Sequence, residues 1–126
     1  MHRSKLVGFI IDCQTQNLQG AARFWGDALG MPVKSFPGEE GDTYMQLVDP
    51  GGRLHIEVQT VAHPSRVHLD IETDDIEAEV RRLESLGALR IAQVKTWVVM
   101  EAPTGHRFCV VHNSSSDFQE RAKEWR

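Results

Sequence analysis

Apolar and polar positions alternate without a break from Val67 to Glu72, which is typical of a strand with one buried face. The pattern then changes to helical spacing over residues 76–86, where Gly87 is a stop signal. Three short apolar segments, each typical of a strand, complete this half of the chain and cover residues 88–94, 96–101 and 106–112. This half is therefore predicted to be a strand, a helix and three further strands.

The first half of the chain carries the same pattern. An apolar strand at 5–12 precedes a helical segment at 18–30 that also ends in Leu-Gly. Three short segments separated by glycine- and proline-containing turns follow, at residues 31–36, 43–48 and 53–61. The sequence therefore contains an internal repeat of one strand-helix-three-strand unit, as module one (about 5–61) and module two (about 66–112).

This repeat predicts an α+β fold of two tandem βαβββ modules in one domain, residues 1–126. Each module is too small to bury its own sheet face well. We therefore expect the two inner sheets to lie together and form a cleft, with the helices outside.

Residues 116–126 are predicted to form an appended helix. Phe118, Ala122 and Trp125 make a narrow apolar stripe on it, which must be covered. The stripe can dock on its own chain or join two chains in a homodimer, and the sequence leaves both possibilities open.

Composition excludes several classes of partner. The chain of 126 residues is 40% hydrophobic and 25% charged, which is ordinary for a soluble globular protein, and its apolar runs are too short to span a bilayer. Its formal net charge is −4 without a dense basic stripe, so we expect neither nucleic acid nor membrane as a partner. Cys13 and Cys109 lie far apart in apolar runs, as expected of reduced thiols in a cytoplasmic protein.

Three stretches carry a family resemblance: "ARFWGDALGM", "HLDIETDDIEAEVRRLESLGA" and "WVVMEAPTGHRFCVV". Their order and spacing resemble the vicinal oxygen chelate superfamily, the group of glyoxalases, bleomycin-resistance proteins and extradiol dioxygenases. The resemblance covers residues 5–112 and is strongest to the short glyoxalase-like proteins whose last strand reads FCVV.

Strand alternation predicts which side chains line the cleft. One face of each of two strands is expected beneath the helices and consists of Leu54, Ile56, Val58, Val67, Leu69 and Ile71. The opposite, cleft face then carries His55, Glu57, Gln59, His68, Asp70 and Glu72. A more ordinary interpretation gives these residues no functional role: His68 is then a hydrogen-bonded histidine, and Asp70 and Glu72 face solvent.

The resemblance also implies a divalent metal, Zn²⁺, Ni²⁺ or Fe²⁺, held by one ligand from each of four inner strands. These positions fall on Gly8, Glu57, His68 and Cys109, although a two-residue slip of register would replace Glu57 by Gln59 or His55. Glycine cannot bind a metal and cysteine replaces a carboxylate, so only His68 and Glu57 remain as expected ligands. The metal site is predicted to be incomplete.

Three functional classes remain. The first is a glyoxalase-like lyase or isomerase, or a dioxygenase-related enzyme, with Glu57 and His68 as the catalytic residues. The second is a metal-free protein that sequesters a small organic ligand, and the third is an interaction module that uses the terminal helix. Expected ligand-binding residues are His55, Gln59, Asp70, Trp97 and Cys109, although Trp97 and Cys109 also suit the core. We predict a small-molecule-binding glyoxalase-like homodimer, with enzymatic activity left open.

Overall fold

The computed structural model describes all 126 residues, which divide into two compact units. One unit, called here the α1 unit, comprises Gly8–His68, and the other, the α2 unit, comprises Met1–Val7 and Leu69–Arg126. The division falls inside strands β1 (His2–Cys13) and β5 (Arg66–Thr73), so each of these strands contributes to both units.

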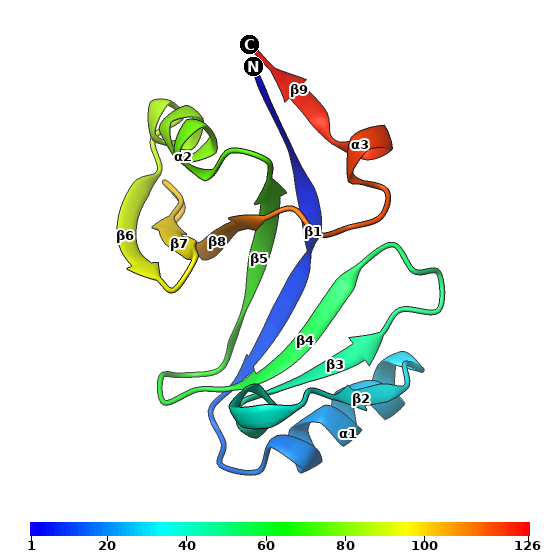
Figure 1. The fold of residues 1–126 in the computed structure, drawn as a ribbon. Coiled ribbons are helices and arrows are strands. Elements are labelled where there is room, and N and C mark those ends of the chain that lie inside the picture. Colours follow the sequence, from blue (N-terminus) through cyan, green and yellow to red (C-terminus); the bar gives the residue numbers. More distant parts are fainter. The chain divides into compact units, whose positions relative to one another are not determined.

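The α1 unit contains the predicted helix and the strands of module one (Figure 1). Besides the second half of β1, its elements are α1 (Leu18–Leu29), β2 (Val33–Ser35), a 3-10 turn (Gly38–Asp42), β3 (Tyr44–Val48) and β4 (His55–Thr60). The strand order is β2-β3-β4-β1, with β1 and β4 parallel. Both predicted ends of α1 are confirmed: the Asn17 side chain accepts a hydrogen bond from the Gly20 amide, and Gly30 is left-handed at φ 70°.

A hydrophobic core lies between α1 and one face of this sheet. Its buried members are Ile11, Cys13, Leu18, Ala22, Leu47, Ile56 and Val58. Alternate residues of β1, β3 and β4 supply the strand part of this set, which confirms the predicted burial of Ile56 and Val58. Leu54, expected beneath the helix as well, precedes β4 and remains 37% exposed.

The α2 unit repeats this arrangement. With the second half of β5, its elements are α2 (Ile76–Ser85), β6 (Leu89–Val94), β7 (Trp97–Glu101), β8 (Arg107–His112), α3 (Phe118–Arg121) and β9 (Lys123–Trp125). The strand order is β5-β8-β7-β6, and β5 and β8 are parallel, as β1 and β4 are. The matching order and the matching parallel pair confirm the internal repeat predicted from the sequence.

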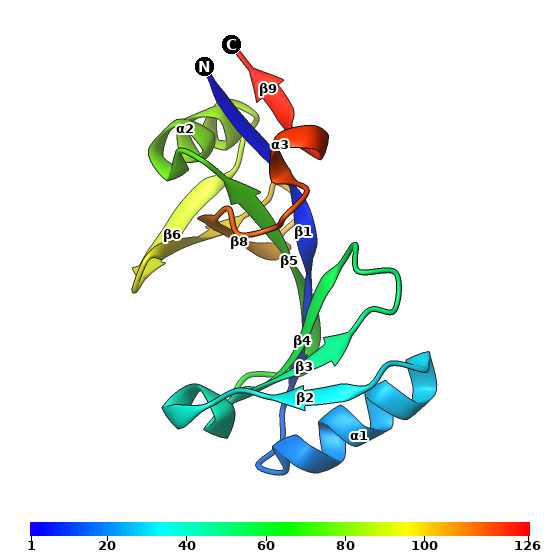
Figure 2. The ribbon, with the colours of Figure 1, turned by 45° about the vertical axis from the view of Figure 1, so that its right-hand side comes forward.

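The core of the α2 unit lies beneath α2, which packs over β6, β7 and β8 (Figure 2). Its buried members are Val80, Leu83, Ala88, Val98, Met100, Phe108 and Val110, with Ile71 packed against them. The prediction that Val67 and Leu69 also lie beneath a helix is wrong, because they are 54% and 50% exposed. The helix is only ten residues long and covers the later strands, so its core reaches β5 only at Ile71.

The structure of the C-terminal segment differs from the prediction. A helix was expected over 116–126, but α3 spans only Phe118–Arg121 and a short strand, β9, follows it. Residues Lys123–Trp125 pair antiparallel with His2–Ser4 of β1, which brings the two chain ends together (Figures 1 and 2). Backbone pairing with an available strand edge therefore replaces the last turns of the expected helix.

The apolar stripe of this segment docks on its own chain. Phe118 is 2% exposed and Ala122 is 9% exposed. The Trp125 indole Nε1 donates to Ser4 Oγ over 2.8 Å, and the Arg82 guanidinium stacks 3.9 Å from the centre of the indole ring. The choice that the sequence left open is thus decided in favour of intramolecular docking.

Glu72 was expected to face the cleft, but it is fully buried. Its Oε1 accepts hydrogen bonds from the backbone amides of Ser114 (2.9 Å) and Ser115 (3.2 Å), and the Lys5 ammonium lies 3.2 Å from its Oε2. Lys5 also pairs with Asp117 at 3.3 Å. This carboxylate holds the segment that follows β8, so its role is structural.

The docking of Trp125 can be tested by the Trp125→Ala variant. Loss of the indole removes a hydrogen bond and a cation–π contact, so the free energy of unfolding should fall by about 2 kcal/mol in urea titrations. Lys123→Ala, an exposed change on the same strand, is the matched control and should have little effect. A Trp125→Ala protein as stable as the parent would contradict the docked arrangement.

Glu72 should make stability dependent on acid pH. Burial alone would raise the pKa of Glu72, but the hydrogen bonds from Ser115 and Ser114, with that from Lys5, leave it below its usual value. A lowered pKa contributes stability above the unfolded value of about 4.3, and this contribution is lost as the pH falls through the folded pKa.

Glu72→Gln should therefore destabilise the protein by about 3 kcal/mol at neutral pH, and by much less in acid, where the parent has lost the same contribution. Urea titrations across the acid range measure both quantities. Glu84→Gln, at an exposed carboxylate on α2, is the control. An equal loss at every pH would refute the electrostatic role of Glu72.

Candidate functional site

The sheet of the α1 unit has a second face, opposite α1, that carries polar side chains. We call this the polar face. Because Ile56, Val58 and Ile11 point into the core, alternation places their neighbours on the other side. Members of the polar face are Asp12 of β1, Tyr44 and Gln46 of β3, and His55, Glu57 and Gln59 of β4. His55, Glu57 and Gln59 therefore lie on one face of the sheet, as the alternation along β4 predicts.

Hydrogen bonds join neighbouring side chains on the polar face. His55 Nε2 and Glu57 Oε2 are 2.5 Å apart, and the Gln59 amide donates to the Tyr44 hydroxyl over 2.9 Å. Gln59 is the register partner of both Tyr44 and Asp12, so it joins β3 to β1 across this face. The row combines an imidazole, a carboxylate, an amide and a phenol, all half-buried.

His68 contacts Asp12, a residue that the sequence predicts only as part of a strand. Its Nδ1 lies 2.7 Å from Oδ2 of Asp12, the penultimate residue of β1. Asp12 is 2% exposed, and Arg66 Nε approaches the same oxygen at 3.9 Å. A carboxylate at the end of an otherwise apolar strand, "LVGFIID", was the available signal for this residue.

Asp12 also affects the neighbouring cysteine. Burial raises the pKa of the Cys13 thiol, and the nearby Asp12 carboxylate raises it further, against a smaller lowering by a hydrogen bond with Trp25. Cys13 belongs to the core beneath α1. It is therefore a protonated core residue and not a nucleophile.

The other predicted ligand-binding residues belong to the α2 unit. Asp70 and Cys109 are register partners on β5 and β8, and Val99 of β7 is the next partner of Cys109. They lie on the face opposite α2, because Phe108 and Val110 point into the core. The half-buried Trp97 alternates with Val98 and so lies on this face as well. The sequence-predicted residues therefore divide between the two units.

A four-ligand metal site does not fit the residues of the α1 unit. Gly8 pairs with His55 in the β1–β4 register, and a Cβ atom added at Gly8 would collide with the His55 carbonyl oxygen. The first-strand position that the resemblance implies, Gly8, is thus closed to a ligating side chain. Of the expected ligands in this unit, Glu57 is paired with His55 and His68 with Asp12. The α1 unit therefore offers fewer donors than a four-ligand site needs.

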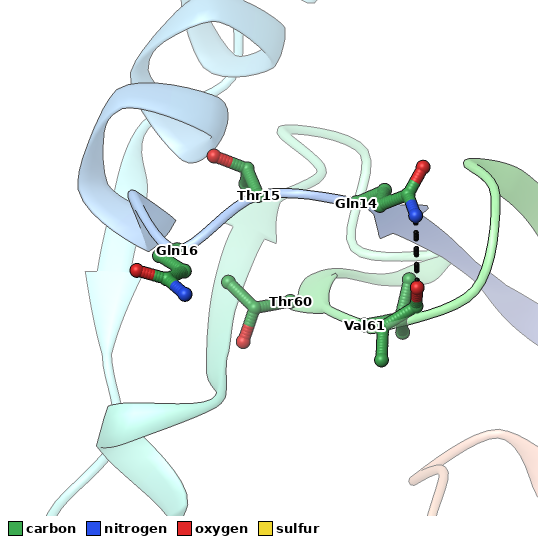
Figure 3. A pocket seen from close by; sticks show the side chains of 6 residues that line it. Gln14, Thr15, Gln16, Thr60 and Val61 are labelled. Carbon is green, nitrogen blue, oxygen red and sulfur yellow. Dashed lines mark hydrogen bonds between the residues drawn. The ribbon is translucent and has the colours of Figure 1, made fainter.

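An open pocket of about 510 Å³ lies at the carboxyl ends of β1 and β4 (Figure 3). It is lined by Gln14, Thr15, Gln16, Thr60, Val61 and Ala62. The Gln14 amide donates to the Ala62 carbonyl over 2.8 Å, which ties the two rims of the pocket together. No titratable side chain lines it, so this pocket offers hydrogen bonds but no acid or base.

The repeated strand-helix-strand arrangement with parallel β1–β4 and β5–β8 pairs defines a vicinal oxygen chelate protein. Residues 8–111 match the model of the glyoxalase-like domain, and the chain belongs to that family. No curated protein matches the sequence. No helix is long and apolar enough to cross a membrane.

Solved structures share the fold at low identity. A hypothetical protein from Bacillus halodurans is 11% identical with a TM-score of 0.65, covering 88% of this chain and 95% of its own. Methylmalonyl-CoA epimerase from Mycobacterium tuberculosis is 16% identical with a TM-score of 0.62, covering 86% and 87%. A 4-hydroxymandelate synthase mutant from Streptomyces coelicolor is 14% identical with a TM-score of 0.52, covering 89% of this chain and 50% of the other.

Whether a side chain fits at Gly8, between β1 and β4, can be tested by substitution. Gly8→Ala should lower the free energy of unfolding by about 3 kcal/mol, because β1 and β4 must separate to admit the methyl group. Gly51→Ala is the matched control: the added Cβ atom would meet nothing closer than Asp49 Oδ1 at 3.6 Å. Urea titration distinguishes the two variants. A Gly8→Ala protein of unchanged stability would show that the first-strand position is open.

Proposed function

We propose that this glyoxalase-like protein binds a small oxygenated organic molecule on the polar face and moves a proton on it, as a lyase or isomerase does. The observation that supports the proposal is that the α1 unit holds two histidine–carboxylate pairs, His55–Glu57 on β4 and His68–Asp12 between β5 and β1. Proton transfer needs a carboxylate or imidazole within reach of the substrate, and these strands offer both.

The reaction class follows from those groups. A base removes the proton from a carbon next to a carbonyl, the C–H electron pair becomes that of an enolate, and a proton returned elsewhere gives an isomer or permits elimination. Glu57 and His68 are the proposed catalytic residues, and His55 and Gln59 orient the ligand. Methylmalonyl-CoA epimerase, a structural neighbour, shares the fold at 16% identity, so the proposal depends on the side chains of this chain.

A second candidate function is metal-free sequestration of an organic ligand. The closed position at Gly8 favours it over an activity that needs the four-ligand metal site, because one of the four expected ligands has no space for a side chain. The pocket at the ends of β1 and β4 offers further hydrogen bonds for such a ligand.

We also propose that the protein is a homodimer and cytoplasmic. Half-exposed apolar side chains on the central strands, Leu6, Val67 and Leu69, support a homodimer. The intramolecular docking of Phe118 removes the terminal helix as the reason for dimerisation, and with it the support for an interaction module. Two unpaired cysteines are in keeping with a cytoplasmic protein.

Solvent exchange tests the proposed activity. Small ketones, hydroxyketones and 2-oxo acids would be screened for binding by thermal shift in the presence of a chelator. Those that bind would be incubated in D₂O, and deuterium at the carbon next to the carbonyl would be followed by NMR. Glu57→Gln should reduce exchange by about 10²-fold or more while binding persists.

The matched control is Glu77→Gln, which changes an exposed carboxylate on α2 and should leave exchange unaltered. Binding without exchange in the parent would favour sequestration. The absence of binding across the panel, or exchange that requires an added metal, would contradict the proposal.

A further inference from the structure

We infer that the pocket at the carboxyl ends of β1 and β4 is a binding site for an uncharged organic carboxamide. The inference goes beyond the proposed function, because it concerns a second site of the α1 unit. The pocket volume of about 510 Å³ lies within the range typical of small-molecule sites, roughly 300–1,000 Å³.

The pocket is separate from the polar face. Thr60, which lines the pocket, is the register partner of Cys13, and Cys13 belongs to the core beneath α1. Gln59 and Asp12, one residue earlier on each strand, point the other way and belong to the polar face. A ligand held by Thr60 therefore lies on the opposite side of the sheet from Glu57.

Hydrogen bonds within the chain hold the two rims of the pocket together. The Cys13 carbonyl accepts the backbone amides of Thr15 and Val61, each over 2.9 Å. The Gln14 side chain reaches the opposite rim and donates to the Ala62 carbonyl over 2.8 Å. The shape of the pocket is thus present without a ligand, which lowers the cost of ordering the site on binding.

Two polar side chains of the pocket have no partner within the chain. Gln16 lies in the loop before α1 and Thr60 at the end of β4, and neither side chain makes a hydrogen bond with another residue (Figure 3). The Thr15 hydroxyl accepts from the Asn17 amide over 3.1 Å, and its own proton is free to be donated. The pocket therefore offers both donors and acceptors to a ligand.

The lining favours an uncharged ligand. None of the six lining residues is ionisable. A bound carboxylate, phosphate or ammonium group would therefore lose water without gaining an opposite charge, which is costly. An uncharged polar group exchanges hydrogen bonds with water for hydrogen bonds with these side chains at a much smaller cost.

A carboxamide fits these groups better than a polyol does. The Gln16 amide places a donor beside an acceptor, and a primary carboxamide presents the complementary pair. Val61 and Ala62 add apolar surface that the hydrocarbon part of such a ligand covers, whereas a polyol has little apolar surface of its own. The ligand class is therefore a primary amide that carries a small aliphatic or aromatic substituent.

Benzamide and benzoate test the inference, because they have nearly the same shape and differ in charge. The full chain, labelled with ¹⁵N, would be titrated with each compound to about 20 mM, above the millimolar Kd expected of so small a ligand. Benzamide should cause saturable NMR shifts of the backbone amides of residues 14–16 and 60–62 and of the Gln16 side-chain amide, and benzoate should not. Equal shifts with benzoate, or no saturable shift at these residues, would overturn the inference, as would saturation by myo-inositol without saturation by benzamide.

A pair of glutamine variants links binding to the pocket. Gln16→Ala removes two hydrogen bonds to the ligand and should raise the Kd for benzamide about tenfold or more. The matched control is Gln19→Ala, at an exposed glutamine of α1 outside the pocket, which should leave the Kd unchanged. Both side chains are exposed, so both variants should keep the melting temperature of the parent in the absence of ligand. Equal affinity of the two variants for benzamide would show that the pocket is not the site.

Discussion

The parallel pairing of the first and last strand of each module is the constraint on which the rest of the structure depends. Parallel strands need a long crossover, and here the helix and two strands between them supply it. In the α1 unit this pairing sets Gly8 beside His55 and Asp12 beside Gln59. The same register thus leaves no space for a side chain at Gly8 and places polar side chains on one face at the other end.

Three carboxylates of this chain are buried, and they differ in the groups that hold them. Glu72 and Glu79 are fully buried, and each is held by several donors from segments distant in sequence. Within the α2 unit they hold the terminal segments, through Lys5 and the residues after β8 in one case and through His2 in the other. Asp12 is almost as buried, but its one close partner is the imidazole of His68. The three carboxylates are thus similar in burial and differ in their partners.

The two modules have diverged along the same scaffold. The polar face of the α1 unit carries Glu57 and His55, whereas the corresponding face of the α2 unit carries Asp70 and Cys109. In the α2 unit the last part of β5 is engaged by the residues that follow β8, through Glu72. An internal repeat therefore provides the same strand positions twice, and side-chain replacement has given them different chemistry.

The sequence by itself determined the repeat, the two long helices, eight of the strands and the family, because each depends on local periodicity, on turn residues and on their order. It also gave the common face of His55, Glu57 and Gln59, since alternation along one strand is a local property. Only the tertiary structure decided that Val67 and Leu69 are exposed and that Glu72 is buried. The length of α2 and the path of the chain after β8 determine which strand residues are covered. The tertiary structure likewise decided the Asp12–His68 contact and the pairing of β9 with β1, which join residues 56 and about 120 positions apart. Such contacts follow from packing between distant segments, and periodicity carries no information about them.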